Sequence, residues 1–182
     1  VVATPANIDL SRHADLIATS LTKYIAGSGD VMGGAVVINP RSPFYRELKP
    51  LVQARHEELL WGEDAGVLAA QARDFPERMR RHNENGLWIA EKLRRHPQIE
   101  KTWYPKWEFS EAYEAVRRPD GGWGSLITFL PKNPEARAPG IYDRLAVCKG
   151  PSLGTAFTLA CPFTLLAHYT ELEWAESCGV SR

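Results

Sequence analysis

The sequence lacks an excess of charge of either sign. Its 182 residues carry 22 Lys and Arg side chains against 22 Asp and Glu, so the formal net charge at pH 7 is zero. Nucleic acids and anionic membrane surfaces attract proteins through clustered positive charge. We therefore expect neither a nucleic acid nor a membrane among its partners. The arginines between residues 73 and 95 alternate with glutamates, which predicts a solvated helix face.

Cysteine and histidine are few and scattered. Cys148, Cys161 and Cys178 are the only cysteines and form no CxxC pair, and the five histidines show no HxxxH spacing. Isolated cysteines at such distances indicate reduced thiols in a cytoplasmic protein. Zinc sites need ligands at short, regular spacings. We therefore expect a cytoplasmic location and no metal.

No apolar run is long enough for a membrane-spanning helix. The longest, residues 154–169, is interrupted by Pro162 and by threonines, whereas a spanning helix needs about 20 apolar residues. It favours a buried strand followed by the start of another element. The chain starts abruptly with Val1, without an initiator Met or a basic-then-apolar leader, so we expect it to be a segment of a longer chain.

Short apolar runs alternate with helical periodicity, a pattern typical of an α/β fold. Buried strands are predicted at residues 14–19 and 33–39. Further strands are predicted at 99–104, 125–130 and 156–161, and helices at 42–58, 64–72 and 140–147. Another helix is predicted to begin after Asp74, because an acidic cap followed by Pro76 and Glu77 is a start signal, and Pro97 is expected to end it.

The chemically informative segment lies between the first two predicted strands. Lys23 follows the first strand, Ser20 and Thr22 precede it at alternate positions, and a glycine-rich stretch follows at residues 27–34. In α/β folds, ligands bind at the ends of the strands. Glycines let the backbone come close to a bound group. A lysine amine beside phosphate donors meets the requirement for pyridoxal phosphate held as a Schiff base. The residues alone leave open an ordinary surface turn, in which the hydroxyls satisfy local backbone groups.

The wider sequence resembles the cystathionine γ-synthase and methionine γ-lyase family of pyridoxal-phosphate enzymes of Cys and Met metabolism. The family pattern Ser-x-Thr-Lys-Tyr, then Gly-x-x-Asp-Val-x-Gly-Gly, stands here as Ser20-Leu-Thr-Lys-Tyr24 and Gly27-Ser-Gly-Asp-Val-Met-Gly-Gly34. Ala3-Thr-Pro5, the stretch from Pro76 to Gly86 and Ser152-Leu-Gly154 also match, in the family's order. The residues of two motifs, Ala3-Thr-Pro-Ala-Asn7 and Ser20-Leu-Thr22, are similar to those of the fungal cystathionine γ-synthase branch.

The resemblance implies an α/β fold of the fold-type I, aspartate aminotransferase-like class. Residues 1–74 would form the C-terminal part of the large cofactor-binding domain. Residues 75–182 would form the C-terminal small domain, incomplete at its end. Family members assemble as homodimers and homotetramers, so the resemblance also implies a homo-oligomer.

The resemblance implies four site residues. Lys23 matches the lysine that bonds the cofactor and then shuttles protons on the substrate. Ser20 and Thr22 match hydroxyls that bind the cofactor phosphate, and Ser152 matches a serine near the substrate α-carboxylate. The implied reaction is γ-replacement, in which an activated homoserine ester loses its acyloxy group and cysteine adds to give cystathionine. Lys149 is the competing lysine, since it lies just before Ser152, but it lacks the flanking hydroxyls and the preceding strand.

Several family features are missing. The Asp that pairs with the pyridine nitrogen stands just before Ala-Thr-Pro in the family, where this chain has Val1 and Val2. The phosphate loop and the stacking Tyr lie further upstream, and the carboxylate-binding Arg lies beyond Arg182. Two alternatives therefore stay open. One is a C–S lyase of the same family, and the other is a truncated, non-catalytic paralogue that associates with full-length subunits.

Overall fold

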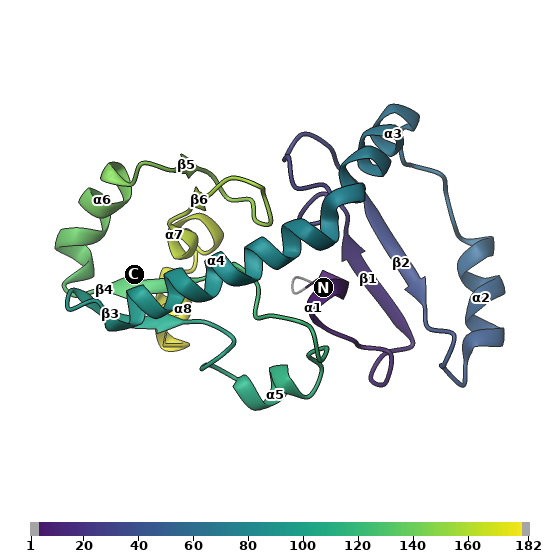
Figure 1. The fold of residues 1–182 in the computed structure, drawn as a ribbon, viewed down its shortest axis with the longest axis horizontal. Helices are drawn as coiled ribbons and strands as arrows, with labels where there is room; N and C mark the ends of the chain where they lie inside the picture. Colours follow the sequence, from purple (N-terminus) through teal and green to yellow (C-terminus); the bar gives the residue numbers. More distant parts are fainter. Residues whose placement is uncertain (1–3, 180–182) are drawn as a thin grey trace.

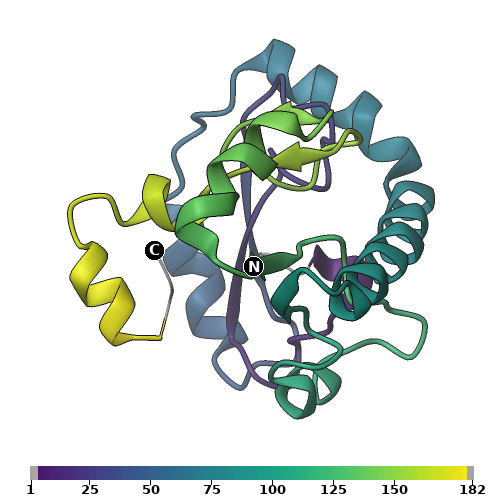
Figure 2. The same ribbon diagram turned by 90° about the vertical axis from the view of Figure 1, so that its left-hand side faces the viewer.

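One long helix connects two small β-sheet units at opposite ends of the molecule (Figure 1). The structure is a computed structural model and describes residues 4–179. The connecting helix, α4 (Phe75–Arg95), begins after Asp74 and ends before Pro97, as the sequence predicts. Pro76 lies in its first turn, where the missing N–H needs no helical partner. Figure 2 shows α4 on one side of the molecule and the C-terminal helices on the other.

The first unit is an antiparallel pair of strands. β1 (Leu16–Ser20) pairs with β2 (Gly34–Ile38), with Leu16 opposite Ile38 and Ser20 opposite Gly34. Both predicted strands are therefore confirmed, and the glycine-rich loop connects them. The expectation that they are buried is wrong for this chain, because Val36 and Val37 are 57% and 49% exposed. Apolar composition predicts a strand, but burial requires neighbouring elements, and this sheet has two strands within residues 4–179.

The helices of this unit differ from the predictions at their ends. α2 (Tyr45–Ala54) starts later and ends earlier than the helix predicted at 42–58. It starts later because the Ser42 hydroxyl donates to Asp15 (2.6 Å) and accepts from the Phe44 N–H (3.0 Å). Ser42 thus stabilises the loop ahead of the helix. α3 (Gly62–Gln71) matches the predicted helix and continues through a short 3₁₀ turn, Ala72–Asp74, into α4.

The second unit follows α4. Its elements in chain order are β3 (Ile99–Trp103), α5 (Ser110–Glu114), β4 (Thr128–Pro131), α6 (Pro134–Arg144), β5 (Cys148–Lys149), β6 (Leu159–Ala160), α7 (Phe163–Ala167) and α8 (Leu172–Ser177). β3 and β4 pair antiparallel, and β5 and β6 pair parallel. The helix predicted at 140–147 is placed too late, since α6 begins at Pro134 after Asn133 in a left-handed conformation. The short helices α5, α7 and α8 were not predicted, because they have too few residues to show helical periodicity.

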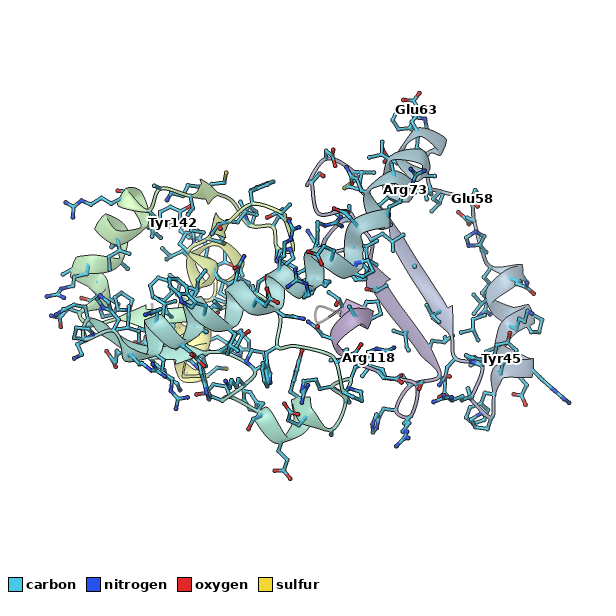
Figure 3. All side chains as sticks on the ribbon, viewed as in Figure 1. Tyr45, Glu58, Glu63, Arg73, Arg118 and Tyr142 are labelled. Carbon is cyan, nitrogen blue, oxygen red and sulfur yellow. The ribbon has the colours of Figure 1, made fainter. Side chains whose placement is uncertain are left out.

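A pair of amide side chains, the buried Asn7 and the half-buried Asn83, ties the start of the described chain to α4. Asn7, in the short helix α1 (Thr4–Asn7), exchanges two hydrogen bonds of 2.9 and 2.8 Å with Asn83. The two side chains also accept the N–H groups of Gly122 (3.1 Å) and Gly124 (3.0 Å). Arg118, labelled beside α1 in Figure 3, donates to the Pro5 carbonyl. These bonds hold α1 against the middle of the molecule.

The apolar core nearest to the glycine-rich loop is small. Ala26, Val31 and Leu68 are buried together, with Leu21 and Leu60 packed against them. This core fastens both ends of the loop to α3. No helix within residues 4–179 is long and apolar enough to cross a membrane.

Candidate functional site

Lys23 lies in the lysine turn (residues 21–27), a hydrogen-bonded turn immediately after β1. The turn is closed by hydrogen bonds from the Ala26 N–H to the Leu21 carbonyl (2.9 Å) and from the Gly27 N–H to the Lys23 carbonyl (2.8 Å). The Lys23 amine donates to the Ser152 hydroxyl at 3.3 Å. The fold thus brings together two of the predicted site residues that are 129 positions apart in the chain.

The lysine faces a cavity. Its volume is about 170 Å³. The lining residues come from α1, from the end of β1, from the lysine turn and from the loop before β6: Thr4, Pro5, Thr19, Ser20, Lys23, Tyr24, Ile25 and Leu153. Ser20 and Lys23 therefore share one cavity, as a common ligand requires. Ser152 is adjacent to a lining residue and reaches the lysine amine directly.

Thr22 faces a different neighbour. Its hydroxyl accepts the Gly33 N–H (3.0 Å) and donates to the Gly33 carbonyl (3.3 Å). The backbone N–H of Leu21 also donates to the Gly33 carbonyl, at 2.9 Å. The side chain of Thr22 therefore fastens the end of the glycine-rich loop beside Lys23, and it does not line the cavity.

Gly154 packs directly against the lysine turn. Its φ is +74°, and a Cβ at this position would lie 2.6 Å from the Tyr24 nitrogen and 3.0 Å from the Lys23 carbonyl carbon. Real Cβ atoms essentially never come so close, so a side chain would force the two segments apart. Glycine at position 154 is what allows the Ser152-containing loop to approach Lys23.

Lys149 lies outside this arrangement. Its amine donates to the Leu145 carbonyl at 2.7 Å and lies 4.7 Å from the centre of the Tyr142 ring. Figure 3 labels Tyr142 on α6, at the end of the molecule remote from β1. The possibility that Lys149 shares the pocket is therefore wrong for this structure, and Lys23 is the lysine that lines the cavity.

Arg78 is the residue at this site that sequence reasoning missed. It was expected on a solvated helix face, yet its side chain is only 13% exposed. Its guanidinium donates to the carbonyls of Tyr24 (3.2 Å), Ile25 (2.7 Å) and Ala26 (3.3 Å). Burial lowers the pKa of Arg78. In a helix rich in basic residues, no local signal separates this arginine from its exposed neighbours.

The rest of that basic face is solvated, as predicted. Arg80 pairs with Glu77 and Glu84, and Arg81 pairs with Glu77. Hydrogen bonds from Arg80, which has the larger effect, and from Arg81 lower the pKa of Glu77 to about 2. Exposed pairs of this kind contribute little to stability.

The next residue after Lys23 connects the turn to α4. Tyr24 is buried, and its ring meets the His82 ring edge-on with 5.3 Å between centroids. His82 Nδ1 lies 2.8 Å from the Ser125 hydroxyl. Burial lowers the pKa of His82, and the nearby positive charge of Arg78 lowers it further by a smaller amount. The His82 ring therefore packs against the side chain of the residue that follows Lys23.

Comparisons with known proteins agree over almost the whole chain. A family model described as "Cys/Met metabolism PLP-dependent enzyme" matches residues 1–175. Cystathionine gamma-synthase of Neurospora crassa is 44% identical over 182 residues, which are 100% of this chain and 29% of that protein. The cystathionine gamma-synthase-like protein ankD of Aspergillus thermomutatus is 40% identical over 182 residues, covering 100% of this chain and 32% of ankD.

A solved structure has the same fold. Cystathionine gamma synthase from Xanthomonas oryzae pv. oryzae, in complex with aminoacrylate and cysteine, superposes with a TM-score of 0.81 at 28% sequence identity. The match covers 100% of this chain and 47% of that chain. The chain therefore spans about half of the solved structure and about a third of the curated relatives.

Proposed function

The chain belongs to the Cys/Met metabolism PLP-dependent enzyme family, and from this membership we propose that the full-length protein is a cystathionine γ-synthase-like γ-replacement enzyme. Its fold is that of the fold-type I enzymes of this family. In the proposed reaction the bond between Cγ of an activated homoserine ester and the ester oxygen breaks, and the carboxylic acid leaves. The cysteine sulfur then bonds to Cγ and gives cystathionine.

The observation that carries the proposal is the position of Lys23 in the cavity. Its amine faces the neutral hydroxyl of Ser152, so the nitrogen can be released to react with an aldehyde by breaking one long hydrogen bond. Ser20 supplies a hydroxyl on the same cavity wall. An amine and a hydroxyl in one cavity are the donors that pyridoxal phosphate requires, one for its aldehyde and one for its phosphate.

Each site residue then has a defined task. Lys23 would hold the cofactor covalently and, once released by substrate, would carry protons between Cα, Cβ and Cγ of that substrate. Ser20 would donate to the phosphate. Ser152 would donate a hydrogen bond from its hydroxyl to the substrate carboxylate. When bound, pyridoxal phosphate supplies an electron sink that stabilises negative charge on the substrate α-carbon.

Ser20 is a stronger candidate for the phosphate than Thr22. The Thr22 hydroxyl has a single proton, and it already donates this proton to the Gly33 carbonyl. It would reach a phosphate only by giving up that 3.3 Å bond. We keep Thr22 as a phosphate ligand on the condition that the glycine-rich loop shifts when the cofactor binds.

The assembly and the location follow from the same family membership. We propose a homodimer or homotetramer in the cytoplasm. Two exposed cysteines, Cys148 and Cys178, are free in the structure, which agrees with a reducing compartment. Light scattering of the full-length protein measures the oligomeric state, and a monomer would contradict the proposed homodimer or homotetramer.

We also propose that α4 begins the small domain, so that residues 1–74 belong to the large domain and 75–182 to the small one.

The covalent site is tested by trapping. The full-length protein is incubated with pyridoxal phosphate and reduced with borohydride, and the labelled peptide is mapped. We expect the pyridoxyl group on Lys23, no labelling there in Lys23→Ala, and unchanged labelling in the control Lys149→Ala. A label on Lys149 would overturn the site, and an inactive protein without any label would favour the non-catalytic paralogue.

The reaction type is tested by product analysis. The wild-type protein is supplied with an acyl-homoserine, with and without cysteine. Formation of cystathionine that depends on cysteine supports γ-replacement. Release of a 2-oxo acid and ammonia as the main products, with cysteine present, would instead assign the protein to the γ-eliminating lyases.

A further inference from the structure

We propose that Arg78 is a positioning residue for Lys23, and that it acts through the backbone of the turn that follows the lysine. The proposal deepens the proposed function, because it concerns the placement of the amine to which that function assigns the chemistry. According to this proposal, a residue at the start of α4 fixes the position of a lysine that lies 55 positions earlier in the chain.

The carbonyl groups of the lysine turn need hydrogen-bond donors from elsewhere. A turn between a strand and a loop has no regular ladder of backbone hydrogen bonds, so its buried carbonyls must find other partners. The carbonyl of Lys23 accepts the Gly27 N–H, and the carbonyl of Gly27 accepts the Ala156 N–H at 2.7 Å. The three carbonyls between them, those of Tyr24, Ile25 and Ala26, all accept from Nη2 of Arg78. One guanidinium nitrogen therefore closes the C-terminal end of the lysine turn.

The guanidinium of Arg78 is itself held in place by several neighbours. Its Nη1 donates to the Gln71 carbonyl at 2.7 Å and pairs with Asp74. Gly27, with φ +81°, lies so close that a Cβ there would be 2.9 Å from Nε of Arg78. The guanidinium thus fills a slot between the end of α3, the start of α4 and the lysine turn. A lysine cannot replace it, because an ammonium is a compact donor on a flexible stem and lacks the planar fork.

The contacts of Arg78 with the lysine turn, called the clamp, affect the position of the Lys23 amine. The turn is held by Arg78 on its carbonyl side, by Gly154 against the Tyr24 nitrogen, and by the Thr22–Gly33 hydrogen bonds at its start. Helix α4 contributes Arg78 and also the His82 ring that packs on Tyr24, and of the two only Arg78 donates to the carbonyls of the turn. If Arg78 is shortened, the carbonyls of the turn lose their shared donor and the turn can rotate. A displacement of about 1 Å of a reacting group can cost on the order of 100-fold in rate.

A purely structural arginine would behave differently. It would lower the stability of the whole protein when replaced, and the remaining folded molecules would work normally. A positioning residue changes the folded protein locally, so the amides of the lysine turn lose protection and kcat falls, while substrate binding is kept. The two roles are therefore separated by local hydrogen exchange and by the comparison of kcat with KM.

The experiment uses the full-length protein with Arg78→Lys, Arg78→Met and the matched control Arg80→Lys. Arg80 lies on the same helix, is exposed and forms only surface ion pairs. In the cofactor-free protein we expect the Ala26 and Gly27 amides to exchange about tenfold faster or more in both Arg78 variants. In the loaded protein we expect kcat to fall about 10- to 100-fold, with KM within about twofold of wild type. Arg80→Lys should match wild type in both measurements.

Each outcome decides the matter. Folded Arg78→Lys protein with wild-type exchange at Ala26 and Gly27 would overturn the proposal, and so would a fall in kcat without faster exchange there. If Arg78→Met fails to fold, the conservative Arg78→Lys variant gives the answer. Failure of the proposed function is separate, because it would appear as absent borohydride labelling of Lys23 in the wild-type protein. The exchange measurement needs no cofactor and still tests the clamp in that case.

Discussion

Replacing Gly154 by alanine should strongly destabilise the protein at the lysine turn. The residue has φ +74°, a conformation that costs an L-residue about 1–2 kcal/mol. The new methyl group would also lie 2.6 Å from the Tyr24 nitrogen and 2.8 Å from its Cγ, and overpacking of this kind typically costs about 1–3 kcal/mol. We therefore expect the free energy of unfolding to fall by about 2–5 kcal/mol in all. The strain is not easily relieved, because the atoms that face the methyl group are a backbone nitrogen and the ring root of the buried Tyr24, not the end of a flexible side chain.

The matched control is Gly66→Ala. Gly66 lies within α3, and a Cβ there would have no atom within 4 Å. Alanine in an exposed helix interior is favoured over glycine by about 0.5–1 kcal/mol, so this variant should be slightly more stable than wild type. Urea unfolding of the two variants beside wild type measures both changes, and they should have opposite signs. Gly154→Ala unfolding at the same urea concentration as wild type would refute the close approach of the two segments.

Two further predictions concern half-buried polar groups on α4. His82→Gln should remove a loss of stability at acid pH. Because the folded state lowers the pKa of His82 below its ordinary 6.5, the unfolded state binds the proton more readily, and the free energy of unfolding of wild type should fall as the pH drops below about 6.5. Thermal melting from pH 7.5 to 5 measures this, with the exposed His13→Gln as control, and an unchanged pH slope in His82→Gln would contradict the assignment. Asn83→Ala should leave Asn7 and the Gly124 N–H without their partner and lower the free energy of unfolding by about 2–4 kcal/mol, and a melting temperature within 1–2 °C of wild type would show that the amide pair is dispensable.

The sequence alone determined the elements whose signals are local. The start of α4 after Asp74 and its end before Pro97 follow from an early and a final proline. The acidic residue marks the start as predicted, but its side chain pairs with Arg78 and forms no capping hydrogen bond. The strands β1 and β2 follow from short β-branched runs on either side of glycines. The family was identified from several motifs in a fixed order, those around Lys23 together with Ala3-Thr-Pro5, the stretch 76–86 and Ser152-Leu-Gly154, because each motif is read from neighbouring residues.

Tertiary structure decided which of these residues meet. The Lys23 amine reaches a hydroxyl 129 positions away, Gly154 admits the loop that carries that hydroxyl, and Arg78 closes the lysine turn from another helix. No periodicity or cap distinguishes Arg78 from Arg80 two positions later, although one is buried on three carbonyls and the other is solvated. The physical reason is that a local pattern sets backbone conformation, whereas burial, hydrogen-bond partners and pKa values depend on which distant segment packs against each side chain.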